Sequence, residues 1–297
     1  SYGSLMHRRG YGRTVAEMWR HARVRSRDIA SWAGGWIIGF ASHAILDRHT
    51  HPYINSRSGW SEAGNPETDR YRSMHPFLER LIDVSLLDRR RGIHPNELDF
   101  YAQVSCGAEP PVEWLDLFEA ALRASYDRGA KDVKLRERLR SAYLDTMGYY
   151  QFTNHVDSSY LEQGLAREDA GDIGPRWLSI VHPPEVPHDL DVLNESHETW
   201  PHPCADGDTS NDSFLDLYDR ALAEGHVMID TIVRAWDNEA DAGAREIEAA
   251  VANWNLSDGR DTEHPCAKHQ ARPLPLAEAH ARIRASIRAG DGGRRLS

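Results

Sequence analysis

The strongest chemical signal in the sequence is a set of metal-binding residue types at helical spacing. His43, Asp47 and His51 lie four residues apart in a segment rich in apolar residues. At about 100° per residue, each step of four turns the side chain by only about 40°, so all three point from one helix face. Imidazole nitrogens and carboxylate oxygens are ligands that zinc accepts. The spacing therefore predicts a metal site on this face.

A second segment repeats the pattern further along the chain. His75 and Glu79 are again four residues apart, and Asp83 follows at the next such position. A lone histidine at a helix contact is more often a core residue than a ligand, but two such pairs favour a metal site. Sites of this kind are usually built between the helices of a bundle. His49 points from a different face of its helix, so we expect it behind the ligands or at the surface.

The elements that must position these residues are predicted to be helices, because apolar residues recur at helical spacing and strand-like alternation is nearly absent. The predicted helices span residues 14–24, 29–51, 70–91, 96–104, 112–126, 132–150, 212–238 and 240–254. Asp28 is expected to cap the second helix, and Pro52 is expected to end it. Residues 178–181 are the strand candidate, inside a long loop at 171–212.

We therefore predict an all-α fold, a multi-helix bundle with the metal cluster between helices. One domain is expected over residues 1–285, followed by a flexible tail at 286–297, which is rich in glycine and arginine.

Composition narrows the class of protein. The formal net charge is -11, which argues against a nucleic-acid scaffold because such a scaffold needs a basic surface. No apolar stretch approaches the roughly 20 residues of a membrane span, so no transmembrane segment is expected. Residues 7–27 are locally rich in arginine. The usual interpretation is a solvated helix face, and the alternative is contact with an anionic substrate or a membrane surface.

Several motifs resemble one known family. The segment from Ile38 to Asp47, continuing through His51 to Asn55, resembles the zinc-dependent phospholipase C family. The segments Tyr2–His7 and His75–Glu79 are similar to it as well. Further along, residues 191–200 and 213–218 look like the C-terminal part of uncharacterised bacterial members. The resemblance spans most of the chain, but its specific motifs lie within residues 2–83.

The resemblance implies an all-α fold related to that of the single-strand-specific zinc nucleases, with a cluster of up to three zinc ions. Two ligand sets follow from the matched motifs. His7 and His43 resemble ligands of one zinc, with Asp47 as the carboxylate that bridges towards a neighbouring ion; His51, His75 and Glu79 resemble the ligands of a separate zinc.

One part of the family pattern has no counterpart before His7. The family supplies an upstream Asp as bridging ligand and base, and uses the N-terminal residue and another early histidine as ligands. We therefore expect two or three zinc ions, and a natural N-terminus that extends beyond Ser1. A cytoplasmic location is slightly favoured, and a secreted one stays open because the natural N-terminus is expected to lie further upstream.

The function implied is that of a zinc-dependent hydrolase of phosphate esters, a phospholipase C-like phosphodiesterase that uses metal-activated water. Its substrate would be a phospholipid or another phosphodiester. Asp47 and Asp83 are the candidate catalytic carboxylates, although Asp47 is expected to act mainly as a ligand. Tyr53, Arg57 and His155 are candidate substrate contacts.

Three alternatives remain open. A nuclease would share the chemistry but would need stacking aromatic and basic residues along a groove, which the acidic charge disfavours. A metal-binding protein without phospholipase activity would have a closed coordination shell. The same fold could also carry other metal chemistry, in which case its pocket would be too small for a lipid headgroup.

Overall fold

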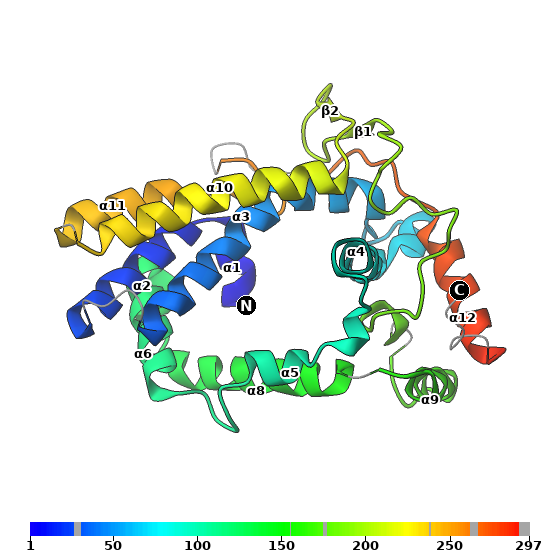
Figure 1. Ribbon diagram of the computed structural model, residues 1–297, viewed down its shortest axis with the longest axis horizontal. Coiled ribbons are helices and arrows are strands. Elements are labelled where there is room, and N and C mark those ends of the chain that lie inside the picture. The colour runs from blue at the N-terminus through cyan, green and yellow to red at the C-terminus, as the bar shows by residue number, and fades with distance from the viewer. Residues whose placement is uncertain (27–30, 155, 175–176, 238, 262–266, 291–297) are drawn as a thin grey trace. The chain divides into compact units, whose positions relative to one another are not determined.

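The computed structural model describes residues 1–26, 31–154, 156–174, 177–237, 239–261 and 267–290. Within these residues the protein is all-α, as predicted, and its regular strands are confined to one short antiparallel pair (Figure 1). The α-helices are α1 (Tyr2–Arg8), α2 (Tyr11–Arg25), α3 (Trp32–Ser58), α4 (Met74–Arg91), α5 (Phe100–Val104), α6 (Val112–Ser125), α7 (Asp127–Lys131), α8 (Leu135–Thr153), α9 (Ser158–Asp169), α10 (Phe214–Ala235), α11 (Ala240–Val251) and α12 (Leu276–Arg288). The 3₁₀ helices are η1 (Pro66–Tyr71), η2 (Pro95–Glu97) and η3 (Trp177–Ser179), and the strands are β1 (Trp200–Pro201) and β2 (Thr209–Ser210).

The chain forms two compact units. The first comprises Ser1–Pro52, Cys106–Thr146 and Leu215–Lys268, and the second comprises Tyr53–Ser105, Met147–Phe214 and His269–Ser297. Three of the five boundaries between the units fall within α3, α8 and α10, and the other two follow Ser105 and Lys268. The expectation of one domain over residues 1–285 stays a prediction.

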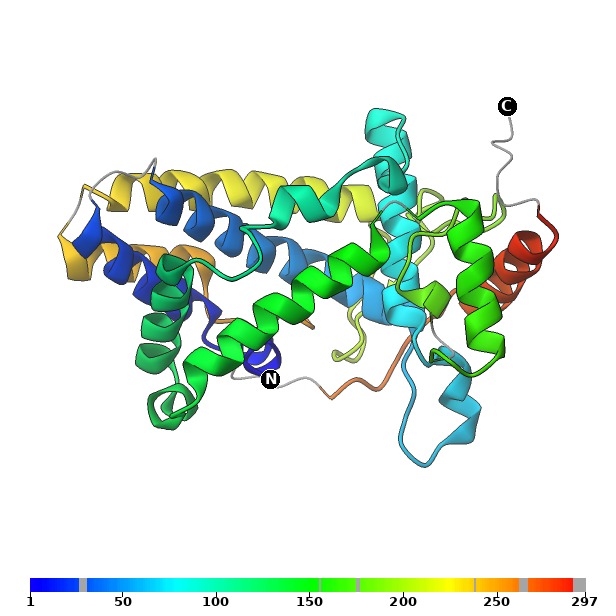
Figure 2. The ribbon, with the colours of Figure 1, turned by 90° about the horizontal axis from the view of Figure 1, so that it is seen from below.

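In the first unit, α2 packs against both α6 and α11, and α3 runs beside α10 (Figures 1 and 2). Apolar residues repeat at helical spacing along α2, and they are buried because they form one face. Trp19 of α2 is fully buried and meets Trp236 edge-on, with ring centroids 6.1 Å apart. A Cβ at Gly243 would lie 2.7 Å from the Trp19 ring, so glycine allows α11 to approach α2 closely.

In the second unit, α4 packs against η3 and α12, and α9 packs against the same two elements (Figure 2). Phe77, Leu78 and Leu81 of α4 are fully buried. The ring of His280 on α12 meets Phe77 edge-on at 5.0 Å. An ion pair of 2.6 Å joins Arg284 of α12 to Glu168 of α9. Apolar burial and a shielded ion pair therefore hold α12 in this unit.

One predicted helix end was wrong. Pro52 lies inside α3 and does not end it. A proline removes one backbone hydrogen bond, but Tyr53 and Ile54, which follow it, are buried, and this burial favours continuing the helix. At the C-terminal end, α12 extends to Arg288, with Ile287 only 2% exposed, so ordered helix enters the segment predicted as a tail. Asp28, the expected cap of α3, and residues 291–297 lie outside the described residues.

The predicted strand at residues 178–181 was also wrong, because Trp177–Ser179 form η3. A short apolar run does not distinguish a buried strand from a buried helical turn. The helix predicted over residues 96–104 is split into η2 and α5, and α1, α7, α9 and α12 were not predicted. None of the helices within the described residues has the length and apolarity needed to cross a membrane.

Candidate metal centre

Three of the predicted ligands converge in the first unit. His43 and Asp47 lie one turn apart on α3, and His7 comes from α1. Nε2 of His43 and Nε2 of His7 lie 3.2 Å and 3.3 Å from Oδ2 of Asp47. The two Nε2 atoms are 3.2 Å from each other. One ligand atom from each residue therefore lies within 4.8 Å of the others, which is compatible with a shared metal ion.

The hydrogen bonding of His7 makes its Nε2 atom suited to bind a metal. Nδ1 of His7 lies 2.8 Å from the carbonyl oxygen of Gly3, so we assign the proton to Nδ1 and the lone pair to Nε2. A hydrogen bond of this kind commonly orients histidine ligands in metal sites. The close Asp47 carboxylate raises the pKa of His7 above its ordinary value, although burial opposes this.

The Asp47 carboxylate itself also fits a cation. Asp47 is buried, and no hydrogen bond of good geometry reaches its Oδ2 atom. A buried carboxylate oxygen without such a bond is costly unless a positive charge compensates it. His7 and His43 remain partly exposed, at 33% and 46% of their side chains, so the group is open to solvent on one side. The residues present therefore fit a divalent ion such as zinc.

His51 lies one turn beyond Asp47 on α3, with Nδ1 3.6 Å from Oδ2 of Asp47. Nδ1 of His51 also lies 3.1 Å from the carbonyl oxygen of Leu256. The backbone N–H of the same Leu256 donates to the carbonyl oxygen of His7 at 2.7 Å. One residue of the chain thus contacts His7 and His51 through its main chain, which fixes the position of both.

Leu256 belongs to a turn that packs on α3, which we call the 255–260 turn. Residues 255 and 260 form a β-bridge across it. Asp258 is fully buried and accepts the backbone N–H of Arg260 at 2.9 Å. Gly259 has a φ of +66°, and a Cβ there would lie 2.3 Å from the carbonyl oxygen of Arg48. Glycine is therefore needed at this position, both for its backbone conformation and for the close approach to α3.

An ion-pair cluster lies on another side of the same helix. The guanidinium of Arg48 is buried, bonds to Glu224 of α10 and to the carbonyl oxygen of Val251, and lies 4.9 Å from the Trp254 ring. His49 contacts the other oxygen of Glu224 at 2.5 Å, so it is not part of the ligand group. Burial would raise the pKa of Glu224, but hydrogen bonds from His49 and Arg48 outweigh burial and lower it. This cluster ties α3 to α10 next to Asp47.

In the second unit, His75 and Glu79 lie one turn apart on α4, with Nε2 3.2 Å from Oε1. Both side chains are about one-third exposed, at 35% and 32%. The pair has the residue types and the spacing of metal ligands. His51, the third predicted member, belongs to the first unit. The joint zinc site of these three residues stays a prediction.

Asp83 follows Glu79 by one turn of α4. Its Oδ2 atom accepts a hydrogen bond from Arg80 at 3.0 Å and lies 3.1 Å from Nε2 of His182. Asp83 remains 44% exposed, whereas His182 is buried. The carboxylate is therefore accessible and held in place, and its catalytic role stays a prediction.

Of the three predicted substrate contacts, Tyr53 and Arg57 lie one turn apart on α3 and are both buried. Tyr53 is fully buried, and its hydroxyl donates to the carbonyl oxygen of Val192 at 2.8 Å. Arg57 is buried and lies 3.5 Å from Glu198. These are the contacts of core residues in the second unit. His155 lies outside the described residues.

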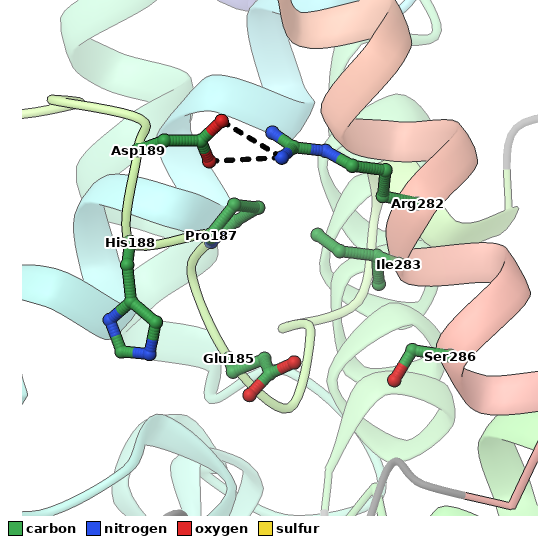
Figure 3. Close-up of a pocket in the computed structure, with 7 residues that line it drawn as sticks. All are labelled: Glu185, Pro187, His188, Asp189, Arg282, Ile283 and Ser286. Carbon is green, nitrogen blue, oxygen red and sulfur yellow. Dashed lines mark hydrogen bonds and ion pairs between the residues drawn. The ribbon is translucent and has the colours of Figure 1, made fainter.

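A groove of about 440 Å³ is present elsewhere in the second unit, between residues 185–189 and α12 (Figure 3). Arg282 points across it to Asp189, and the two are joined at 2.9 Å (Figure 3). This pairing lowers the pKa of Asp189. The arginine of the groove is thus already bonded to a carboxylate, and no predicted site residue lines the groove.

The structure adds residues that the sequence did not indicate as parts of the centre. Leu256 acts through its main chain, for which its apolar side chain gives no signal. Glu224 is far in sequence from Arg48 and His49, which it contacts, and it belongs to no recognisable spacing pattern. Spacing of four residues identifies neighbours within one helix only, so it does not reveal contacts between helices.

Comparison with protein families, with curated proteins and with solved structures gave no match. The resemblance to zinc-dependent phospholipase C thus rests on the motifs themselves.

Proposed function

We propose that this chain is a zinc-dependent hydrolase of phosphate esters, with a phospholipase C-like phosphodiesterase reaction. The observation that carries the proposal is the convergence of His7, His43 and Asp47 on one another in the first unit. The matching motif at His75 and Glu79, whose Nε2 and Oε1 atoms lie 3.2 Å apart, supports a second zinc site.

The reaction proposed is hydrolysis, in which water attacks phosphorus and the bond to the leaving alcohol oxygen breaks. A bound zinc ion would supply Lewis acidity and positive charge beside the phosphate. The role of the chain's own residues is to hold the ligand side chains in place and to orient them. Gly3 fixes the ring of His7, Leu256 fixes the ring of His51, and Arg48 anchors α3 next to Asp47. This preorganisation lets the site act without rearrangement.

Partial exposure of His7 and His43 is what favours catalysis over a purely structural metal site. A structural zinc is enclosed by protein ligands, whereas a catalytic zinc keeps a position open to water or substrate. The described ligand group has three side chains, and 46% of the His43 side chain is exposed. Solvent can therefore reach the group.

The test is hydrolysis of bis(p-nitrophenyl) phosphate by zinc-loaded and by chelator-treated protein. We expect turnover that chelator abolishes and zinc restores. The Asp83→Asn variant should keep its zinc but lose most of kcat if the carboxylate of Asp83 is catalytic. The protein could also bind zinc stoichiometrically and turn over neither this compound nor any lipid phosphodiester. That result would exclude the hydrolase and indicate a metal-binding protein without this activity.

A further inference from the structure

The arginines near the N-terminus fall into two groups. In the later part of α2 they contact their own helix: Arg20 pairs with Glu17, and Arg23 lies 5.2 Å from the centre of the Trp19 ring. The arginines of residues 8–13 are different, because they lie near α6 and α7 and are exposed. They are therefore available to a partner outside the chain.

Together with cations of α7 and of the turn after it, these arginines form one group. All six members are exposed, and none of them has an acidic partner within ion-pair distance among the residues that the structure describes. We call this group the basic face: Arg8, Arg9, Arg13, Arg128, Lys131 and Lys134. The face thus carries positive charge that carboxylates of the described chain do not pair with.

Several contacts bring the two segments of the basic face together within the first unit. The hydroxyl of Tyr2 in α1 donates to the carboxylate of Asp132 at 2.9 Å, and the guanidinium of Arg128 lies 5.1 Å from the centre of the Tyr2 ring. On the side of α2, the guanidinium of Arg13 donates to the carbonyl oxygen of Ala124 at 3.0 Å. Cations that are far apart in the sequence therefore share one surface.

The backbone below this surface is also held in place. Tyr126 is buried, and its hydroxyl donates to the carbonyl oxygen of Arg9 at 2.8 Å. The same hydroxyl accepts a hydrogen bond from Thr14 at 3.2 Å. A surface that is ordered before binding loses less conformational freedom when a partner binds. The basic face is therefore suited to act as a binding surface.

The sequence around the basic face is positively charged, although the chain as a whole is acidic. Residues 1–26 contain six arginines and one acidic residue, Glu17, and residues 127–134 contain three cations and two aspartates. One of these aspartates, Asp132, is already bonded to Arg138 at 3.1 Å. The formal net charge of the chain is -11. A negative partner is thus attracted to this face and repelled by the acidic remainder of the chain.

The limited extent of the basic face favours a short partner. An anionic bilayer or a nucleic acid is negatively charged over a much larger extent, so it would also meet acidic parts of the chain. A nucleic acid would need free aromatic rings for stacking, but the Tyr2 ring lies against the Arg128 guanidinium. Val133 is 92% exposed between Lys131 and Lys134 and adds an apolar contact. These features fit a segment with several carboxylates and an apolar side chain.

We propose that the basic face binds a short acidic segment of a partner protein, with carboxylates on the six cations and an apolar side chain on Val133. This goes beyond the proposed function, since none of these residues is a predicted ligand, catalytic residue or substrate contact. Binding of this kind depends on charge, so it weakens as salt screens the exposed groups.

Two labelled heptapeptides test the proposal. One has a leucine with three glutamates on either side, and the other has glutamines in place of the glutamates. Protein without added zinc is used, so that carboxylates do not bind to the metal. Fluorescence anisotropy at about 50 mM salt should give a Kd for the glutamate peptide at least about tenfold lower than for the glutamine peptide. At about 300 mM salt this advantage should fall to less than about threefold.

Two variants locate the binding. Lys131→Glu combined with Lys134→Glu reverses the charge after α7, and Arg13→Glu reverses it in the first turn of α2, where the helix dipole favours a carboxylate. Each variant should reduce the glutamate advantage to less than about threefold. The control combines Arg167→Glu with Arg245→Glu, which reverse two exposed cations outside the face. It should keep the full advantage.

Other outcomes overturn the proposal. These are equal binding of the two peptides, a glutamate advantage that both face variants retain, and a glutamate advantage that the control also loses. Co-sedimentation with vesicles of phosphatidylcholine and phosphatidylglycerol that depends on Lys131 and Lys134, without a glutamate advantage, would assign the face to a lipid surface. Zinc content and phosphodiester hydrolysis do not enter these measurements, so their outcome does not depend on the proposed function.

Discussion

Nε2 of His7 and Nε2 of His43 lie 3.2 Å apart, although the two residues come from different helices. Both nitrogens also lie near the same buried oxygen of Asp47. When both histidines carry their protons on Nδ1, the lone pairs of the two Nε2 atoms and of the carboxylate oxygen repel one another in the absence of a cation. A divalent ion turns the same arrangement into a favourable one. This local relationship is the physical reason for expecting metal at the centre of the first unit.

Gly259→Ala should destabilise the protein and weaken metal binding together. A Cβ at this position would lie 2.3 Å from the carbonyl oxygen of Arg48, and φ is +66°. The 255–260 turn would have to move away from α3, and with it the Leu256 main chain that contacts His7 and His51. We expect a loss of about 2 kcal/mol or more in the free energy of unfolding. Denaturant titration and zinc titration measure the two effects.

Gly64→Ala is the matched control for that variant. Gly64 also has a positive φ, +83°, but a Cβ there would meet no atom within 4 Å. The Gly64→Ala variant should lower the free energy of unfolding by the backbone strain alone, roughly 1 kcal/mol, and should leave zinc affinity unchanged. Equal zinc affinity in the two variants would show that the turn does not position the ligands.

His280 should make the protein sensitive to acid. Burial lowers the pKa of His280 from 6.5 to about 4, and the nearby charge of Arg284 acts in the same direction. The folded state then binds fewer protons than the unfolded state between these pH values. Stability is therefore fully present above about pH 6.5 and falls as the pH drops towards 4, by at most about 3 kcal/mol.

The His280→Leu variant isolates this effect, because leucine keeps an apolar contact with Phe77 and does not titrate. Its free energy of unfolding should fall less between pH 7 and pH 4 than that of the unchanged protein. His188→Leu, at an exposed position, should retain the full acid sensitivity. Identical pH profiles for the His280 variant and the unchanged protein would contradict the assignment.

Glu224→Ala should lower stability through Arg48. The Arg48 side chain is 3% exposed, and the variant leaves its guanidinium without the carboxylate that bonds to it. Because Glu224 itself is 38% exposed, water can replace part of the interaction. We expect a loss of about 1–3 kcal/mol in the free energy of unfolding, and a smaller loss for Glu224→Gln. Asp230→Ala, at an exposed position of the same helix, should change stability by less than about 0.5 kcal/mol.

The sequence predicts those features that depend on local periodicity. His43 with Asp47, and His75 with Glu79, follow from the helical repeat, and the helices that carry them were found because their apolar faces are regular. The all-α class follows for the same reason. By contrast, nothing in the spacing of residues links His7 to His43. That pairing was implied by the family resemblance, and in the structure it depends on the packing of α1 against the rest of the first unit.

The features that the sequence did not predict are those in which tertiary burial outweighs a local rule. The helix α3 passes through Pro52 because the residues beyond it are buried. Residues 177–179 form a 3₁₀ turn against α4 and α9, although β-branched residues follow at 180–181. Arg57 is a surface residue by type, yet it is buried beside Glu198.

The most direct test of the central claim is the zinc content of the purified protein. Protein loaded with zinc and freed of excess metal by gel filtration is analysed by inductively coupled plasma mass spectrometry, together with His43→Ala, Asp47→Asn and the control His49→Gln. We predict at least one tightly bound zinc per chain, one fewer in each of the two ligand variants, and an unchanged content in the control. A chain that binds no zinc, or ligand variants that keep its full zinc content, would contradict the metal centre described here.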